Sequence, residues 1–383
     1  MKVAIFSDSL PPQTDGVSRT YVNLAKTFLE ENIEFRFISP FKPGKEYQWH
    51  KNVNRTASIP LLLYPEYKIS LPNQSQLIKL LSEFQPDLIH VSSPTLLGLS
   101  GLSLANQFQI PAVAAYHTHF ADYFKYYGYA FIEKWGWNFV RWFYNQFVKV
   151  FVPSQTTINE LHKLEFNNLE LWQRGVDLDT FSPANRKLSL RHKWAPNGET
   201  LLLFTGRLVK EKDIHDVINV NKMLLKSRLK FRQVFVGDGP MKNEIKSALP
   251  GVVFTGYLYG KELAEAYASC DIFFFPSTTE TFGNVVLEAS ASGLPAVISN
   301  KGGIVDLVQH GKTGFIAQAN NKIEFVNYLV ELVTQRELYS AMQKEAWKSA
   351  VHFKWKSINN KLILSYQETI ENYYRQKKYR GVA

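Results

Sequence analysis

The chain has 383 residues, of which 45% are hydrophobic, and this is enough for roughly two domains that each bury a core. Its single cysteine, Cys270, excludes an internal disulfide and a site built from several cysteines, and favours a reducing cytoplasm. The net charge of +10 suits an anionic nucleotide or an anionic membrane surface, whereas no recognised nucleic-acid-binding module accompanies it, so no nucleic acid partner is expected.

Short apolar runs alternate with amphipathic stretches along the chain, which is typical of parallel βαβ units. Strands are predicted at 2–7, 34–38, 88–91, 112–116 and 148–152, and again at 200–205, 232–236, 252–255, 271–275 and 296–298. Helices are predicted at 18–31, 75–83, 95–107 and 285–291, with a last helical run at 356–379. The pattern restarts after Asp177, and 177–197, with two prolines and few apolar residues, indicates a linker. We therefore predict an α/β fold with two doubly wound domains.

The strongest functional pattern runs from the end of strand 271–275 into helix 285–291, and its two glutamates, Glu280 and Glu288, stand eight positions apart. A helix N-terminus offers N–H groups and partial positive charge to a phosphate. The residues expected at this helix mouth are Thr281, Phe282, Gly283, Asn284 and Val285. Glu288 falls inside the helix, where it reaches a ribose hydroxyl, and Glu280 falls where a sugar would sit. This layout predicts a nucleotide-sugar site.

Basic and glycine residues follow other predicted strands. Arg207 and Lys212 come after strand 200–205, where fixed cations would stabilise the charge that develops on a departing diphosphate. Gly16, in the loop after the first strand, lets the backbone approach a phosphate or sugar closely. Gly237, in the turn after strand 232–236, is expected beside the nucleotide base. The loop around Gly16 is not a Gly-x-Gly-x-x-Gly sequence, so dinucleotide binding is disfavoured.

Two further pairs raise the question of a metal. His117 and His119 follow strand 112–116, but no third zinc ligand suggests itself. Asp177 and Asp179 form an Asp-x-Asp pair of the kind that elsewhere holds a divalent ion under a diphosphate.

The run 276–295 resembles the signature of retaining, family 4-type glycosyltransferases with the GT-B fold. The matching features are a strand followed by Pro276-Ser277, Glu280, seven residues, Glu288-Ala289, and Ser292-Gly293-Leu294-Pro295. The resemblance implies that Arg207 and Lys212 hold the donor phosphates, that the Gly16 loop faces the β-phosphate, and that His117 contacts the transferred sugar or the acceptor oxygen. His119 and Arg174 are then expected on the acceptor side. The family is metal-independent, so 177–179 would belong to a hinge, and neither a metal nor a cofactor is expected. Asp213 departs from the family, which commonly has glycine there.

A narrower resemblance points to lipid-directed members, namely sulfoquinovosyl diacylglycerol synthases and related mannosyl- or glucosyltransferases. It is carried by the segments 62–67, 90–94, 116–119, 171–177 and 266–269. The segment 120–151 is rich in aromatic residues with interleaved lysine and arginine. It is either an interfacial membrane contact or an aromatic core helix with a loop.

Together these observations predict an acceptor-side domain at 1–180, a nucleotide-sugar domain at 181–355, and a last helix at 356–383 that crosses back to the first domain. The predicted activity is transfer of a hexosyl group from a UDP- or GDP-linked sugar to a hydroxyl of a lipid or glycan. We expect a cytoplasmic enzyme, in peripheral contact with the inner face of the membrane. The alternatives are a nucleotide-sugar epimerase on the same fold and a protein that binds a nucleotide-sugar without turnover; a phosphorylase is less suitable because no pyridoxal lysine motif is present.

Overall fold

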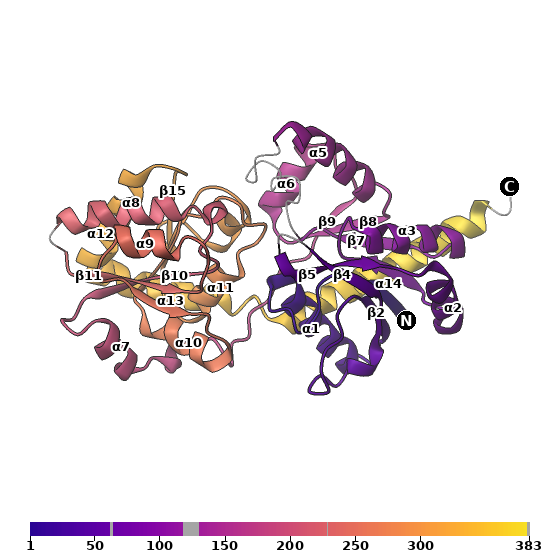
Figure 1. Cartoon of the computed structure of the whole chain (residues 1–383), viewed down its shortest axis with the longest axis horizontal. Coiled ribbons are helices and arrows are strands. Elements are labelled where there is room, and N and C mark those ends of the chain that lie inside the picture. Colours follow the sequence, from indigo (N-terminus) through magenta and orange to yellow (C-terminus); the bar gives the residue numbers. More distant parts are fainter. Residues whose placement is uncertain (62–63, 118–129, 228, 381–383) are drawn as a thin grey trace. The chain divides into compact units, whose positions relative to one another are not determined.

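The computed structural model describes residues 1–61, 64–117, 130–227 and 229–380 (Figure 1). It contains two compact units. Unit 1 consists of Met1–Gln173 together with Trp355–Ala383, and unit 2 of Arg174–Lys354.

Unit 1 is built on a seven-stranded parallel sheet with the order β3-β2-β1-β6-β7-β8-β9. The strands are β1 Lys2–Phe6, β2 Glu34–Ser39, β3 Val53–Arg55, β6 Leu88–Val91, β7 Ala112–Ala115, β8 Lys149–Val152 and β9 Leu169–Leu171. Strands β4 (Ala57–Leu61) and β5 (Tyr64–Leu71) form a separate antiparallel pair.

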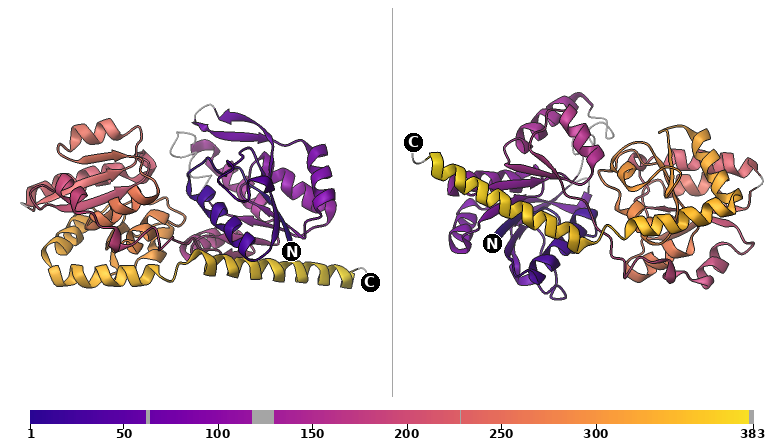
Figure 2. Two further views of the ribbon diagram at one scale, coloured as in Figure 1. Left: turned by 90° about the horizontal axis from the view of Figure 1, so that it is seen from below. Right: turned by 180° about the vertical axis from the view of Figure 1, so that it is seen from behind.

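Helices accompany this sheet, and the last of them comes from the far end of the chain. The helices are α1 Gly16–Glu30, the 3₁₀ turn η1 His50–Asn52, α2 Gln74–Phe84, α3 Leu96–Phe108, α5 Ala130–Tyr144, α6 Gln155–Lys163 and α14 Trp355–Arg380. Helix α14 lies beside α1 (Figure 2). In this contact Asn359 Nδ2 donates to Thr27 Oγ1 at 3.0 Å. The predicted last helix therefore packs on unit 1.

Unit 2 is built on a six-stranded parallel sheet with the order β12-β11-β10-β13-β14-β15. Its strands are β10 Thr200–Thr205, β11 Phe231–Val236, β12 Val253–Gly256, β13 Ile272–Phe275, β14 Ala296–Ser299 and β15 Gly314–Ala317. Its helices are η2 Pro183–Asn185, α7 Leu188–Trp194, η3 Lys210–Lys212, α8 Ile214–Leu224, η4 Leu225–Ser227, α9 Lys242–Ala248, α10 Gly260–Ser269, α11 Asn284–Ala291, η5 Gly303–Leu307, α12 Lys322–Thr334 and α13 Arg336–Ala350.

Every predicted strand is present, and each observed end lies within one residue of the predicted one. These strands are found because continuous apolar runs, such as the fully buried Ile-Phe-Phe-Phe of β13, belong to sheets covered on both faces. Strands β3, β9 and β15 were not predicted. They lie at sheet edges, and β3 and β9 are short and partly exposed. The pair β4–β5 was also missed.

The strand orders place a topological switch point in each sheet. In unit 2 the chain passes outward from β10 to β11 and β12, and then returns to the other side of β10 with β13. In unit 1 the same reversal occurs between β1 and β6. Ligands of doubly wound sheets bind at such points, outside the carboxyl ends of the two strands. The loops after β10 and β13 are therefore the expected ligand site of unit 2.

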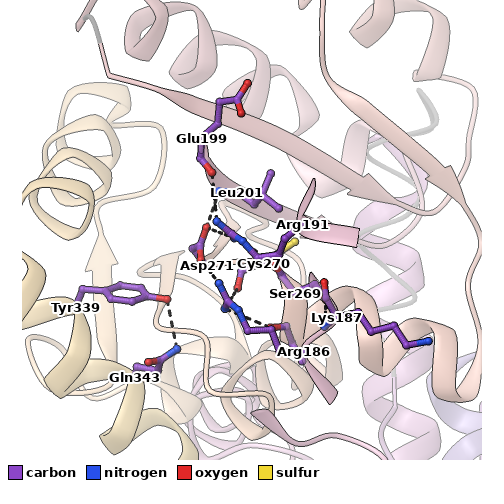
Figure 3. A network of polar contacts seen from close by, with 11 residues as sticks. Arg186, Lys187, Arg191, Glu199, Leu201, Ser269, Cys270, Asp271, Tyr339 and Gln343 are labelled. Carbon is purple, nitrogen blue, oxygen red and sulfur yellow. Dashed lines mark hydrogen bonds and ion pairs between the residues drawn. The ribbon is translucent and has the colours of Figure 1, made fainter. Parts of the chain in front are cut away.

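The predicted linker 177–197 is folded onto unit 2 instead of being extended. Arg191 Nη1 donates to Asp271 Oδ2 at 2.6 Å, and Arg186 Nη2 donates to Asp271 Oδ1 at 3.2 Å (Figure 3). The same carboxylate accepts from the Leu201 N–H at 2.9 Å, and Trp194 at the end of α7 is buried. Asp271 directly precedes β13, so this network lies at the amino-terminal end of that strand. The switch-point loops lie at the opposite, carboxyl-terminal end. Proline content suggested a linker, whereas long-range ion pairs decided the fold of this segment.

Candidate active site

Hydrogen bonds fasten the loop after β10 to the loop after β13. The Asp213 carboxylate accepts from both the N–H and the hydroxyl of Thr278, at 2.8 Å each. Thr279 Oγ1 donates to the Glu211 carbonyl at 2.9 Å. Burial raises the pKa of the Asp213 carboxyl, against the effect of the two bonds from Thr278. Asp213, which stands where the resembled family commonly has glycine, thus connects the two loops through its hydrogen bonds with Thr278.

This fastening brings together two residues that the sequence placed 68 positions apart. Lys212 Nζ donates to Glu280 Oε1 in an ion pair. The side chains are 24% and 17% exposed, so the pair is largely shielded but still reached by solvent. A cation and a carboxylate that were predicted to serve phosphate and sugar are therefore in direct contact. Arg207 lies in the same loop as Lys212, after β10, and is half-buried.

Two glycines, to which the sequence analysis gave no role, shape the Glu280 loop. The Gly303 N–H donates to the Glu280 carbonyl at 2.6 Å. Gly302 has φ +75°, and a Cβ on it would lie 2.6 Å from that same carbonyl oxygen. Since neither the conformation nor the space allows a side chain, Gly302 must remain glycine for Glu280 to be held in this place.

The predicted helix mouth is the N-terminus of α11, with Gly283 as its N-cap and no side-chain capping bond. Within the described part of the chain, the N–H groups of Gly283, Asn284 and Val285 have no hydrogen-bond acceptor. Such N–H groups, together with the helix dipole, suit a phosphate. Phe282 is buried and contacts the ring of Phe353, so it offers its backbone, not its side chain, to this mouth.

Glu288 lies in the second turn of α11 and is 4% exposed. Its Oε2 accepts from the hydroxyl of Tyr267 at 2.9 Å. Tyr267 belongs to α10 and is fully buried, so its hydroxyl holds the Glu288 carboxylate in a fixed orientation. No pattern in the sequence identified this partner, because α10 and α11 meet only in the folded unit.

Gly237 follows β11 and is packed against the loop that carries Arg207. Its φ is +131°, a Cβ would lie 2.0 Å from the Gly206 carbonyl oxygen, and its N–H donates to the Gly256 carbonyl at 2.8 Å. Only glycine fits between these two loops. The turn therefore holds the Arg207 loop in place.

In unit 1, Gly16 is the first residue of α1. Asp15 caps this helix, and its Oδ1 accepts from the N–H groups of Val17 and Ser18 at 2.8 Å each. Ser9 Oγ donates to the other oxygen of Asp15 at 2.7 Å. The loop after β1 is thus closed onto the start of α1, and the first-turn N–H groups at Val17 and Ser18 are already bonded.

The predicted acceptor-side residues fall in different places. His117 follows β7, is 8% exposed, and has its Nε2 3.1 Å from the Tyr21 hydroxyl. Arg174 begins unit 2 and is 4% exposed. His119 lies outside the described residues, and so do residues 120–129 of the aromatic segment 120–151.

No cluster of three or more potential metal-ligating histidine, cysteine or acidic side chains occurs among the residues that the structure describes. The Asp177 carboxylate, considered above as a metal ligand, accepts from the N–H groups of Asp179 and Thr180 and from the Thr180 hydroxyl. It therefore caps a turn. In the described ranges, none of the helices is long and apolar enough to cross a membrane.

Comparison with known proteins identifies both halves of the chain. Residues 14–180 match the family described as Glycosyltransferase Family 4, and residues 187–349 match Glycosyl transferases group 1. A GDP-mannose-dependent alpha-mannosyltransferase of Mycobacterium tuberculosis is 32% identical over 374 residues, which cover 96% of each chain. The Arabidopsis thaliana sulfoquinovosyl transferase SQD2 is 31% identical, over 98% of this chain and 75% of the plant protein.

A third relative, the alpha-monoglucosyldiacylglycerol synthase of Streptococcus pneumoniae, is 29% identical over 78% of this chain and 70% of its own length. Among solved structures, Anabaena HepE in complex with UDP and glucose superposes with a TM-score of 0.77 at 19% identity, over 96% of this chain and 100% of the other. The predicted two-domain α/β fold and the predicted family are confirmed.

Proposed function

The chain belongs to the family 4 glycosyltransferases, and from this premise we propose that it transfers a hexosyl group, with retention, from a nucleotide diphosphate-sugar to a hydroxyl of a membrane lipid or glycolipid. The observation that supports this best is the junction of the loops after β10 and β13. There, the Lys212–Glu280 pair and the mouth of α11 adjoin the switch point of a doubly wound sheet.

In the proposed mechanism, the donor diphosphate is held by the N–H groups at the start of α11 and by the cations of Arg207 and Lys212. Negative charge grows on this diphosphate as the glycosidic bond breaks, and preorganised donors and cations stabilise it. Glu288, oriented by Tyr267, accepts hydrogen bonds from the ribose hydroxyls. We propose that no metal takes part, because the two cations already supply the positive charge.

The sugar acquires oxocarbenium character in the transition state. A carboxylate at Glu280 stabilises this positive charge and orients the sugar hydroxyls. Its ion pair with Lys212 keeps a counter-charge beside it, which makes it a weak nucleophile. We therefore assign Glu280 to electrostatic stabilisation and not to a covalent intermediate. His117 of unit 1 is proposed to contact the transferred sugar or the acceptor oxygen.

The acceptor is proposed to be a lipid, reached from the cytoplasmic face of the membrane. Helix α5 exposes large aromatic side chains at helical spacing: Trp135 is 77% exposed, Trp142 51% and Phe139 41%. The Phe139 and Trp142 rings are in contact, with centroids 6.0 Å apart, and Lys134 and Arg141 lie on the same helix. Aromatic rings flanked by cations are typical of helices that lie in a bilayer interface. The name of the glucosyldiacylglycerol synthase relative favours the same class of acceptor.

Labelled UDP- and GDP-sugars, mixed with the enzyme with and without a lipid extract, separate the proposal from its alternatives. Transfer predicts nucleotide release that depends on lipid, and a labelled lipid product. Interconversion of nucleotide-sugars without lipid would instead indicate an epimerase. None of the three relatives reported above is named as an epimerase. Tight binding without any product would leave a non-catalytic binding protein and would refute the proposal.

A further inference from the structure

The antiparallel pair β4–β5 of unit 1 turns an apolar face to solvent. In its register Ala57 lies opposite Leu71, and two positions further along Ile59 lies opposite Ile69. All four side chains therefore share one face, because side chains alternate along a strand. Ile59, Ile69 and Leu71 are 36% to 49% exposed, whereas Ser70, which points to the other face, is 2% exposed. An antiparallel sheet usually buries its apolar face and exposes its polar one, so this pair has the reverse arrangement.

A groove of about 750 Å³ begins at this face and follows helix α3. One of its walls is formed by the start of β4, the end of β5 and the start of α2. The other wall is one side of α3, made by Leu96, Leu99, Ser100 and Ser103. These positions span two helical turns, or about 10 Å. Although 20% of the residues in the sequence are charged, none of the described residues that line the groove is. The groove therefore suits an elongated, uncharged and apolar ligand.

Two of the polar groups in the groove already have hydrogen-bond partners within their own helices. The Ser100 hydroxyl donates to the Leu96 carbonyl at 2.9 Å. Asn73, the N-cap of α2, accepts from the Gln76 N–H through its Oδ1 at 3.1 Å. An apolar chain that lies against these two groups would leave both bonds in place, so it would not create an unsatisfied polar group there.

The groove opens at the ligand end of the unit 1 sheet. Leu96 is the first residue of α3 and is 51% exposed, and Thr95 is the N-cap of this helix. Thr95 Oγ1 donates to Asp8 Oδ2 at 2.6 Å, and Ser93 Oγ donates to the same oxygen at 2.8 Å. Asp8 follows β1 and Ser93 follows β6, so this polar cluster lies at the switch point between those strands. Polar groups at the switch point are thus followed directly by the apolar groove.

We propose that this groove binds an acyl chain of the acceptor lipid, while the hydroxyl-bearing headgroup of the same lipid lies at the loops after β1 and β6. The proposal rests on the proposed function and deepens it, because it gives the hydrocarbon part of the acceptor a site on unit 1. This site is separate from the aromatic face of α5, which was assigned to the bilayer surface. Methylene groups in the groove would be shielded from water, which favours a lipid that has partly left the bilayer.

A monoacylglycerol with a diazirine group on its acyl chain tests the location of the chain directly. The full-length enzyme is irradiated with this probe in the absence of any donor, and labelled peptides are identified by mass spectrometry. We expect label on the segments 69–74 and 96–103, and less label when unmodified monoacylglycerol competes. Absence of label from both segments would overturn the proposal, even if α5 is labelled.

Replacing Leu71 and Leu96 together with glutamine makes the groove polar, and both side chains are exposed enough for the fold to tolerate the change. In the unmodified enzyme, the Kd of monomeric monoacylglycerols should fall about two- to fourfold for each added methylene group, because burying a methylene gains up to about fourfold in affinity. The double variant should lose this dependence and bind a medium-chain lipid about tenfold more weakly, the effect of a few methylenes.

Leu188→Gln is the matched control, because Leu188 is also the first residue of a helix, α7, and is 68% exposed, but belongs to unit 2. It should keep the full dependence on chain length. The same dependence in the double variant as in the control would refute the groove as the site of the chain.

Sedimentation velocity examines the other possible occupant, a second copy of this chain. A dimer that the double variant abolishes, with lipid binding unchanged, would overturn the proposal in favour of a contact between copies. The binding measurements need no donor. Failure of sugar transfer with an intact dependence on chain length would therefore refute the proposed function alone, whereas transfer without that dependence would refute only the acyl-chain site.

Discussion

Replacing Gly283 with alanine should displace the N-terminus of α11 on which the proposed diphosphate site depends. Gly283 has φ +90°, and a Cβ on it would lie 2.3 Å from Cγ2 of the buried Ile304. The next nearest atoms are Ile304 Cβ at 3.5 Å and Val286 Cγ2 at 3.6 Å, which are ordinary contacts. A single methyl group of Ile304 therefore accounts for the steric conflict.

Two effects determine the size of the loss. A left-handed backbone costs a residue with a Cβ about 1–2 kcal/mol, and an overpacked core costs about 1–3 kcal/mol. We expect Gly283→Ala to lower the free energy of unfolding of unit 2 by about 2–5 kcal/mol. An anion at a partly buried helix N-terminus gains up to about 2 kcal/mol, so loss of this geometry should raise the Kd of UDP or GDP by up to about 30-fold.

Urea unfolding and titration calorimetry with UDP and GDP measure the two effects, and changes at Ile304 isolate the methyl group. Ile304→Ala removes Cγ2, so Gly283→Ala should cost only the backbone strain of about 1–2 kcal/mol in that background. Ile304→Val keeps a methyl group at this position and is the control, in which the full cost should remain. An equal cost of Gly283→Ala in all three backgrounds, or an unchanged Kd, would show that this contact does not set the helix mouth.

Three other predictions concern the donor and the acceptor. Glu288→Ala should weaken nucleotide binding about 10- to 100-fold, because a hydrogen bond to a charged group is lost, whereas Glu280→Gln should mainly lower kcat; equal effects of both variants on Kd and kcat would contradict the two assignments. Lys212→Met should lower kcat about 10²- to 10³-fold, because stabilisation of the departing diphosphate is lost. The unmodified enzyme should keep its activity in EDTA. Activity that EDTA abolishes and manganese restores would refute the metal-free mechanism. Trp135→Ser with Trp142→Ser should reduce sedimentation with anionic lipid vesicles while transfer to a short-chain soluble acceptor is kept, and undiminished sedimentation would exclude the outer face of α5 as the membrane contact.

The sequence by itself determined the type of fold and the family. Short apolar runs such as that of β13 are typical of strands in a sheet covered on both faces, where the side chains on both sides of the strand are buried. The motif around Glu280 and Glu288 is likewise local, since a strand, a loop and a helix in succession place both residues at one strand end. Edge strands such as β9 remained unpredicted because they are short and partly exposed, which leaves little apolar pattern.

The tertiary structure alone decided which side chains meet. Lys212 pairs with Glu280, Tyr267 orients Glu288, and Tyr366 reaches His90 across 276 positions. The physical reason is that a residue's own neighbours in sequence fix its element and its burial, whereas its partner depends on the order of the strands and on which helices cover them. Local periodicity carries no information on that order, so contacts between elements exist only once the chain has packed.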